Sequence, residues 1–247
     1  MPPIEINGQT VSDVVVNGQS VDQVTANGQT VFAAIPDSVI DNFEDDPDGP
    51  YGDSNTVADF YSGDTDAFSR TTADVVEGQE ALGTDTTGTQ MMVSEPGEGL
   101  LDYPDEDDTI SVLLRQPADI PQGAVIVRGS ISSGNISGYA IRISDGAIVV
   151  RRIDDGSDTV ILNATDATEI DDETWHWVEV SPPTDEDSVL KVDVFELDTT
   201  NILPASNTPI ESESVSDSNY TVENGVGAAR FSGSGTGTFL DFIGVNN

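Results

Sequence analysis

Turn residues recur about every ten residues along most of this chain, and no stretch shows the periodicity of an amphipathic helix. Between the turns, short segments alternate apolar with polar residues. Tyr139 to Ile143 and Ala147 to Ile153 flank a Ser-Asp-Gly turn, and Thr174 to Val180 alternates again. Alternation with a period of two sends successive side chains to opposite faces of a strand. The pattern therefore predicts an all-β chain of short antiparallel strands, arranged as a sandwich or jelly roll.

The start of the chain repeats one decapeptide three times, with Asn-Gly-Gln-Thr/Ser-Val beginning at Asn7, Asn17 and Asn27. Asn-Gly favours a two-residue hairpin turn, because both residues tolerate positive φ. The valines give each repeat a short apolar face, which a single hairpin cannot bury alone. We therefore predict a short β-repeat or meander over residues 1–36 that stacks on its neighbours or on another chain. The sandwich is predicted to occupy residues 37–247.

Charge is the most unusual property of the composition. The chain has 46 acidic and 8 basic residues, and its formal net charge is −38. Self-repulsion of this size destabilises a compact state, whereas concentrated salt screens it, since the Debye length falls to about 3 Å at 1 M. We interpret the chain as a folded protein of a high-salt environment; the alternative, an acidic disordered chain, is disfavoured by the strand patterns. The same charge argues against nucleic-acid binding, which needs basic surfaces.

The sequence shows neither a targeting signal nor a cysteine. It contains no cysteine, so neither a disulfide nor a catalytic thiol is expected. Its first residues carry neither the basic segment nor the apolar segment of a secretory signal. No apolar run approaches the roughly 20 residues that span a bilayer. We expect assembly in a cytoplasm, export without a signal peptide and no membrane insertion.

Several segments occur in the order typical of a known module. These are "DNFEDDPDGPYGD", "EGQEAL", "GYAIRISDGAIVVRRID", "TWHWVEV" and "GVGAARFSGSGTGTFLDFIGV". Together they resemble concanavalin A-like, LamG-type jelly-roll modules over about residues 38–245. The resemblance implies an antiparallel jelly-roll sandwich. The polar segment from Ile202 to Asn219 is longer than the corresponding turn of that family, and we expect it to be a surface loop.

The resemblance also implies a candidate calcium site. Modules of this kind often hold Ca²⁺ where the first and last strands meet. Asp41 and Glu44 lie at that first turn, and Asp241 lies on the last strand. Ca²⁺ takes six to eight oxygen ligands, so these three carboxylates are the candidate metal ligands. The alternative is a solvated acidic turn, which a chain this acidic has in abundance.

Paired carboxylates suggest one candidate for catalysis. Glu169, Asp171 and Glu173 match the Glu-x-Asp-x-Glu pattern of one family of jelly-roll glycosidases, in which two carboxylates flank the scissile bond. Such a strand needs apolar residues between its carboxylates, but Asp172 takes one of those places. We therefore predict no catalytic residues and expect that the protein is not an enzyme.

The only histidine, His176, lies between Trp175 and Trp177 on an alternating segment. A single histidine excludes a multi-histidine metal site, and we expect it to be packed in the sheet. The two tryptophans share one face of the predicted strand. They either fill the core or line a ligand surface, and the sequence leaves both readings open.

The decapeptides also resemble short repeats at the ends of tail and appendage proteins of tailed viruses. Together with the charge and the missing signal peptide, this resemblance predicts a virion surface protein of a halophilic archaeal virus, such as a capsid turret, tail fibre or baseplate component. Residues 1–36 would bind other virion proteins and form a homo-oligomer, a trimer or pentamer. The jelly roll would attach to a glycan or S-layer glycoprotein of the host.

Three alternatives remain open from the sequence. The first is a carbohydrate-binding or adhesion module of a haloarchaeal cell-surface protein. The second is a jelly-roll enzyme that processes glycosides. The third is a purely structural virion component that binds nothing outside the particle.

Overall fold

The fold is taken from a computed structural model of the chain. The structure describes these residues: 5–6, 9–10, 15–16, 19–20, 23–26, 29–33, 38–41, 43, 61–71, 76, 81–84, 88–94, 108–117, 122–144, 146–185, 187–199, 202–221, 223–231 and 237–246. Apart from one short 3₁₀ helix, the regular structure in these ranges is β-strand.

The decapeptide repeats form three separate antiparallel hairpins. Their strands are β1 (Glu5–Ile6) with β2 (Gln9–Thr10), β3 (Val15–Val16) with β4 (Gln19–Ser20), and β5 (Gln23–Ala26) with β6 (Gln29–Ala33). In the sequence, one Asn-Gly pair separates the two strands of each hairpin, and these pairs lie outside the described residues. Among the described residues, each strand pairs only within its own hairpin rather than with the next repeat.

The rest of the chain forms two antiparallel sheets. The nine-stranded sheet runs in the order β19 (Leu203–Pro204), β18 (Leu190–Asp198), β17 (His176–Ser181), β12 (Thr109–Leu114), β22 (Gly237–Asn246), β10 (Ala81–Thr84) and β9 (Phe68–Thr71), while β20 (Glu211–Val215) also pairs with β18 and β7 (Ser38–Asp41) with β22. The first strand, β7, and the last strand, β22, are thus neighbours, as expected for the predicted module.

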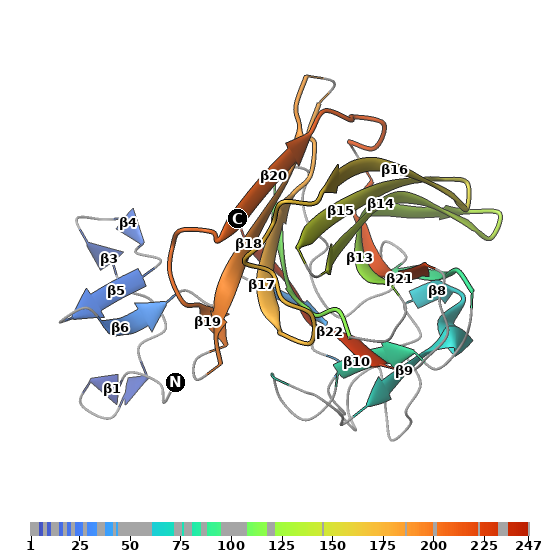
Figure 1. The fold of residues 1–247 in the computed structure, drawn as a ribbon. Helices are drawn as coiled ribbons and strands as arrows, with labels where there is room; N and C mark the ends of the chain where they lie inside the picture. Colours follow the sequence, from blue (N-terminus) through green and yellow to red (C-terminus); the bar gives the residue numbers. More distant parts are fainter. Residues whose placement is uncertain are drawn as a thin grey trace.

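The seven-stranded sheet faces the first one. Its order is β16 (Ser157–Ala164), β15 (Ala147–Asp154), β14 (Asn135–Ser144), β13 (Gln122–Ser132), β21 (Gly225–Phe231), β11 (Gln90–Ser94) and β8 (Tyr61–Gly63). The 3₁₀ helix η1 (Thr65–Ala67) follows β8. Figure 1 shows the two curved sheets facing one another. The predicted all-β jelly-roll sandwich is confirmed.

The main core lies between the sheets and follows from the alternation of each strand. Ile141 and Val150 contribute to it from the seven-stranded sheet, and Val178, Val192 and Ile243 from the nine-stranded sheet, all fully buried. Each fully buried side chain of this size contributes about 1.5–3 kcal/mol by leaving water. The sandwich is therefore stabilised by residues that the period-two pattern marks in the sequence.

The hairpin predicted from "YAIRISDGAIVVRRI" is confirmed as β14 and β15. Ser144 pairs with Ala147, and Gly146 between them has a φ of +64°. The predicted loop from Ile202 to Asn219 differs in part, because it contains β19 and the edge strand β20. The alternating run in β20 pairs with β18 in register, which satisfies backbone groups that a loop would leave to water.

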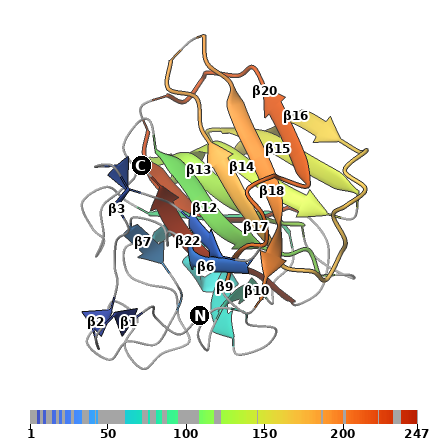
Figure 2. The same ribbon diagram turned by 90° about the vertical axis from the view of Figure 1, so that its left-hand side faces the viewer.

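The three hairpins lie on the side of the sandwich that carries the nine-stranded sheet. In Figure 1 they are the blue elements on the left, and Figure 2 views the molecule from that side, with the seven-stranded sheet behind. The outer face of the seven-stranded sheet therefore points away from the repeats. In the described part of the chain, no helix is long and apolar enough to cross a membrane.

Candidate functional site

The outer face of the seven-stranded sheet combines apolar residues with two arginines. Tyr139 and Ile141 of β14 point into the main core, so Ala140 and Arg142 point outward. On the adjacent strand β15, Arg151 lies opposite Ala140 in register and shares the outward face. Charged groups on a largely apolar sheet face are uncommon, which makes this surface a candidate binding site.

The apolar floor of this face combines three alanines with larger apolar residues. The apolar cluster on it consists of Met91, Val93, Ala124, Ile126, Ile136, Ala140, Ile153, Ala229 and Phe231, with Ile131 packed beside them. Ala140, Ala124 and Ala229 lie on three adjacent strands, β14, β13 and β21 in that order. Because alanine side chains are short, longer side chains on either side can lean over them. All nine clustered residues are buried, each 5% exposed or less.

Arg151 and Phe231 meet above this floor. The guanidinium carbon of Arg151 lies 4.7 Å from the centroid of the Phe231 ring, a cation–π contact. Their strands, β15 and β21, are separated by β14 and β13. With neighbouring strands about 4.8 Å apart, this contact bridges three strand spacings. Arg151 also forms a salt bridge with Asp158, so its side chain is held from two directions.

Arg142 lies diagonally next to Arg151 on the same face. Ala140 pairs with Arg151 and Arg142 pairs with Val149, the diagonal arrangement in which long side chains interact. Burial lowers the pKa of Arg142, the positive charge of Arg151 lowers it further, and Asp172 partly offsets both. The buried Nε of Arg142 has no hydrogen-bond partner among the described residues.

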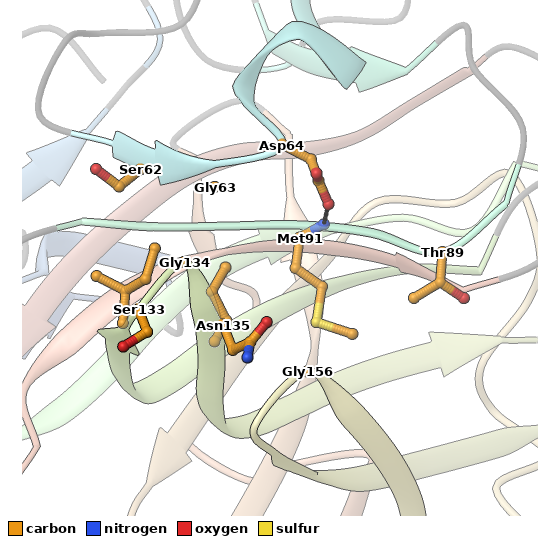
Figure 3. A pocket seen from close by; sticks show the side chains of 11 residues that line it. Ser62, Gly63, Asp64, Thr89, Met91, Ser133, Gly134, Asn135 and Gly156 are labelled. Carbon is orange, nitrogen blue, oxygen red and sulfur yellow. Dashed lines mark hydrogen bonds between the residues drawn. The ribbon is translucent and has the colours of Figure 1, made fainter.

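A groove lies at the end of the same face. It has a volume of about 730 Å³ and is lined by Ser62, Gly63, Asp64, Thr89, Met91, Ile131, Ser133, Gly134, Asn135, Ile136 and Gly156. In Figure 3 the β8 strand and the β13–β14 turn face each other across it, and the Met91 side chain extends from β11 toward the turn at Gly156. Met91, Ile131 and Ile136 also belong to the apolar floor, so the groove and the floor are continuous.

Two tight turns form one wall of the groove. Ser133 and Gly134 both have positive φ, as do Asp155 and Gly156, and these are the two-residue turns that suit the twist of a hairpin. The opposite wall requires Gly63, whose φ is +112°; a Cβ there would lie 2.5 Å from the Met91 carbonyl oxygen. Side-chain-free backbone thus brings β8 close to β11 and shapes the groove.

Hydrogen bonds fix these walls. The Asp64 backbone N–H donates to the Met91 carbonyl (2.8 Å), and the Met91 N–H donates to Asp64 Oδ2 (3.1 Å). At the opposite wall, the Gly156 N–H donates to the Ile136 carbonyl (2.7 Å). The groove therefore offers hydroxyl, amide and carboxylate groups beside an apolar floor, a combination that suits a ligand with both hydroxyl groups and C–H surfaces.

A second polar network lies at the edge of the core and is structural. Tyr139 Oη donates to Asp217 Oδ1 (2.8 Å), Arg152 binds Asp217 (2.7 Å) and Asp154 (2.9 Å), and Tyr220 Oη donates to Asp154 (2.7 Å). Burial raises the pKa of Tyr139, and it raises that of Tyr220 to about 12. Donors and acceptors bind each other here, so the network ties the β20–β21 connection to the seven-stranded sheet.

The candidate calcium ligands are only partly described. Asp41 ends β7, where it pairs with Ile243, and Glu44 lies outside the described residues. Asp241 is fully buried, and its Oδ2 accepts a hydrogen bond from the Val76 N–H (2.6 Å). No group of three or more His, Cys, Asp or Glu side chains among the described residues could hold a metal. The calcium site stays a prediction.

The remaining residues singled out by sequence lie elsewhere. Glu169, Asp171 and Glu173 are exposed in the turn that precedes β17, and they are not part of the sheet. His176 is buried, as predicted; burial lowers its pKa, and its Nδ1 lies 3.0 Å from the Thr174 carbonyl oxygen. Trp177 is buried on the outer face of the nine-stranded sheet and not between the sheets.

Sequence reasoning missed both Arg142 and the groove. The signal for Arg142 is in "YAIRI", where an arginine takes the place of an outward-facing residue in an otherwise apolar segment. No comparable signal marks the groove, because its lining comes from four separate stretches of the chain. Glycines and small polar residues occur throughout this sequence, and only the tertiary structure selects these few.

Comparison with known proteins gives matches of structure but not of sequence. No protein-family model and no curated protein matches the chain. Solved structures that it resembles include a carbohydrate-binding module, CBM66, from Bacillus subtilis (TM-score 0.47, 15% identity, 73% of this chain and 96% of that one). A protein of unknown function from Shewanella oneidensis (0.44, 17%, 76% and 78%) and the Caenorhabditis elegans galectin LEC-6 (0.36, 9%, 62% and 93%) also match. These values are too low to decide function, which is inferred below from the residues.

Proposed function

We propose that the protein is a non-catalytic attachment module that binds an oligosaccharide along the outer face of the seven-stranded sheet. The groove at the end of that face carries the proposal, because it places polar side chains such as Asp64 and Asn135 beside the apolar Met91 and Ile136. Sugars present hydroxyl groups at their edges and C–H groups on their faces. Carboxylate and amide groups can pair with the hydroxyls while the apolar floor covers the C–H surface.

The proposal includes the setting in which the module works. We place it on the surface of a virion of a halophilic archaeal virus, assembled in a cytoplasm of high salt, where residues 1–36 join it to other virion proteins and to copies of itself. The net charge of −38 and the decapeptide repeats support this setting. Symmetric display would multiply weak contacts with a host glycan or S-layer glycoprotein. A structural Ca²⁺ held by Asp41, Glu44 and Asp241 belongs to the same proposal.

Glycan binding is tested with the full chain in molar KCl on an array of immobilised oligosaccharides. Replacing Asn135 with alanine removes one amide from the groove and should weaken binding about threefold to tenfold, the value of one or two neutral hydrogen bonds. The matched control is Asn207→Ala, which removes an exposed amide from the segment between β19 and β20. A chain that binds no glycan would contradict the proposal and favour a purely structural virion component.

The role of residues 1–36 has its own test. Light scattering in molar KCl should show an oligomer for the full chain and a folded monomer after removal of residues 1–34. An unchanged oligomer after the deletion would contradict anchoring through the repeats. Incubation of the protein with the neutral and acidic oligosaccharides that it binds, followed by product analysis, tests the absence of catalysis, and any cleaved product would overturn that part of the proposal.

A further inference from the structure

We propose that Arg142, oriented beside Arg151, binds an anionic group, a carboxylate or a sulfate, on the oligosaccharide, so that the module selects acidic glycans. This inference rests on the proposed function, since it concerns a second contact point on the same face. It adds a class of ligand that the groove alone would not select, because the groove residues are neutral apart from Asp64.

The arrangement of the two arginines suits an anion. Arg151 is fixed by Asp158 on one side and by the ring of Phe231 on the other. Arg142 is its diagonal neighbour on the outward face of β14. A planar guanidinium presents a fork of N–H donors that matches the two oxygens of a carboxylate or sulfate. An anion bound there would also relieve the repulsion between the two arginines.

The lack of a carboxylate on Arg142 is notable in this chain. The sequence offers 46 acidic residues for 8 basic ones, yet the buried Nε of Arg142 has no hydrogen-bond partner among the described residues, and Asp172 acts on Arg142 through its charge. A partly buried guanidinium without a partner is costly. An external anion would supply what the chain does not.

The neighbouring arginine Arg152 shows the opposite case. It binds Asp154 at 2.9 Å and Asp217 at 2.7 Å, and both contacts stay within the protein. An arginine of this sheet that stabilises the fold is therefore paired with carboxylates of the protein itself. Arg142 lies two residues beyond Ala140 on β14, on the opposite face of the sheet from Arg152. It does not serve the fold in this way and is available to a ligand.

The distance between the groove and Arg142 sets the length of the ligand. Arg142 lies six residues from Ile136 along β14, and a strand rises about 3.3 Å per residue, so the arginine is about 20 Å from the groove. One sugar ring cannot reach both points. The ligand is therefore a chain of several sugars, with one end in the groove and an acidic unit at the arginine pair.

The test uses the full chain and three probes: neutral dextran oligomers, sulfated dextran oligomers of the same length, and oligogalacturonate, which carries carboxylates. Binding is measured by calorimetry in 1 M KCl for the wild type, Arg142→Gln, Arg142→Lys and the control Lys191→Gln. Lys191 is exposed on the nine-stranded sheet, so its replacement changes the net charge equally at a distant site. Thermal unfolding of each variant checks that the fold is kept.

We expect the wild type to bind at least one acidic probe about tenfold or more tightly than the neutral one. Arg142→Gln should lose that preference while keeping its affinity for neutral dextran, Arg142→Lys should lose part of it, and Lys191→Gln should keep it. Comparison of sulfated dextran with oligogalacturonate shows which anion is preferred. Equal binding of neutral and acidic probes, or an Arg142→Gln variant that retains the preference, would overturn this inference and leave the proposed function standing. Failure to bind any probe or any glycan would overturn both.

Discussion

The two outer faces of the sandwich are built from side chains of different size. On the nine-stranded sheet, Leu113, Trp177, Phe195, Leu197 and Phe242 form a buried cluster, in which the rings of Trp177 and Phe242 stack with centroids 5.9 Å apart. On the seven-stranded sheet, three alanines lie among larger apolar residues, and Arg151 extends to the ring of Phe231. The residues of both clusters are buried, and the two faces differ in their chemistry: aromatic rings dominate one, whereas alanines, aliphatic residues and arginines share the other.

Polar groups on the two faces differ in the same way. On the nine-stranded sheet, the Trp177 Nε1–H donates to Glu179 (3.1 Å), and Lys191 Nζ and Ser212 Oγ both contact Asp193 at 2.6 Å. These donors are used within the sheet. On the seven-stranded sheet, Arg151 pairs with Asp158, but the Nε of Arg142 has no hydrogen-bond partner among the described residues. The proposed function therefore places binding on the second face, while the first contributes to stability.

The largest expected effect is a loss of stability on mutation of the outer face of the nine-stranded sheet. Replacing Trp177 with alanine should cost about 3–5 kcal/mol of unfolding free energy, because it removes a buried ring that stacks on Phe242. Glycan affinity should not change as long as the protein is folded. Denaturant unfolding in 2 M KCl measures the stability, and Trp177→Phe, which keeps an aromatic ring, should lose less. A large loss of affinity in folded Trp177→Ala would contradict the division of roles.

A smaller effect is expected at Phe231 on the seven-stranded sheet. Phe231→Leu keeps an apolar side chain but removes the ring face beneath Arg151, and cation–π contacts contribute about 0.5–1 kcal/mol. We expect a stability loss of about 1 kcal/mol and roughly a threefold loss of affinity for acidic probes, with neutral probes unaffected. Calorimetry with the dextran and sulfated dextran pair measures the difference. Unchanged acidic binding would show that Arg151 needs no support from the ring.

The smallest effect concerns pH. Burial raises the pKa of Glu179, and the hydrogen bond from Trp177 only partly offsets this. A carboxyl with a raised pKa in the folded state contributes stability below its unfolded pKa of 4.5, and that stability is lost as pH rises through the folded value. Glu179→Gln should therefore gain stability over the wild type as pH rises from about 4 to 7.

The pH prediction has a matched control in Glu169→Gln, since Glu169 is exposed in the turn before β17. Denaturant unfolding at several pH values in 2 M KCl gives the difference between each variant and the wild type. A difference that stays flat with pH for Glu179→Gln, or an equal slope in both variants, would contradict a buried carboxyl on this face.

The fold could be predicted from sequence to a large extent. The alternation in "YAIRI" and "AIVVRRI" marks the two faces of β14 and β15, and the Ser-Asp-Gly turn marks their hairpin. The strand β20 was missed, because its alternation is between serine and glutamate and carries little apolar signal. β20 forms because β18 offers it an unpaired edge, and this edge is a property of the tertiary structure.

The candidate site was beyond reach of the sequence for a similar reason. Residues as distant as Gly63, Met91, Asn135 and Gly156 line one groove, and nothing local marks them as neighbours. The candidates that local spacing did suggest, Glu169, Asp171 and Glu173, lie exposed in a turn. The spacing of residues along a chain can identify functional groups that share one strand or helix. The lining of this groove comes instead from several strand ends and turns.

The sequence by itself determined the class of fold, the three Asn-Gly hairpins and the acidic surface, because alternation, turn preference and charge act over a few residues or over the whole composition. The tertiary structure alone decided that Trp177, Phe195 and Phe242 gather on one outer face and that three alanines gather on the other. It also decided that Arg151 reaches across two strands to Phe231 while Arg142 stays without a partner among the described residues. Such contacts depend on how strands far apart in sequence are paired, and that pairing is set by burial of the common core.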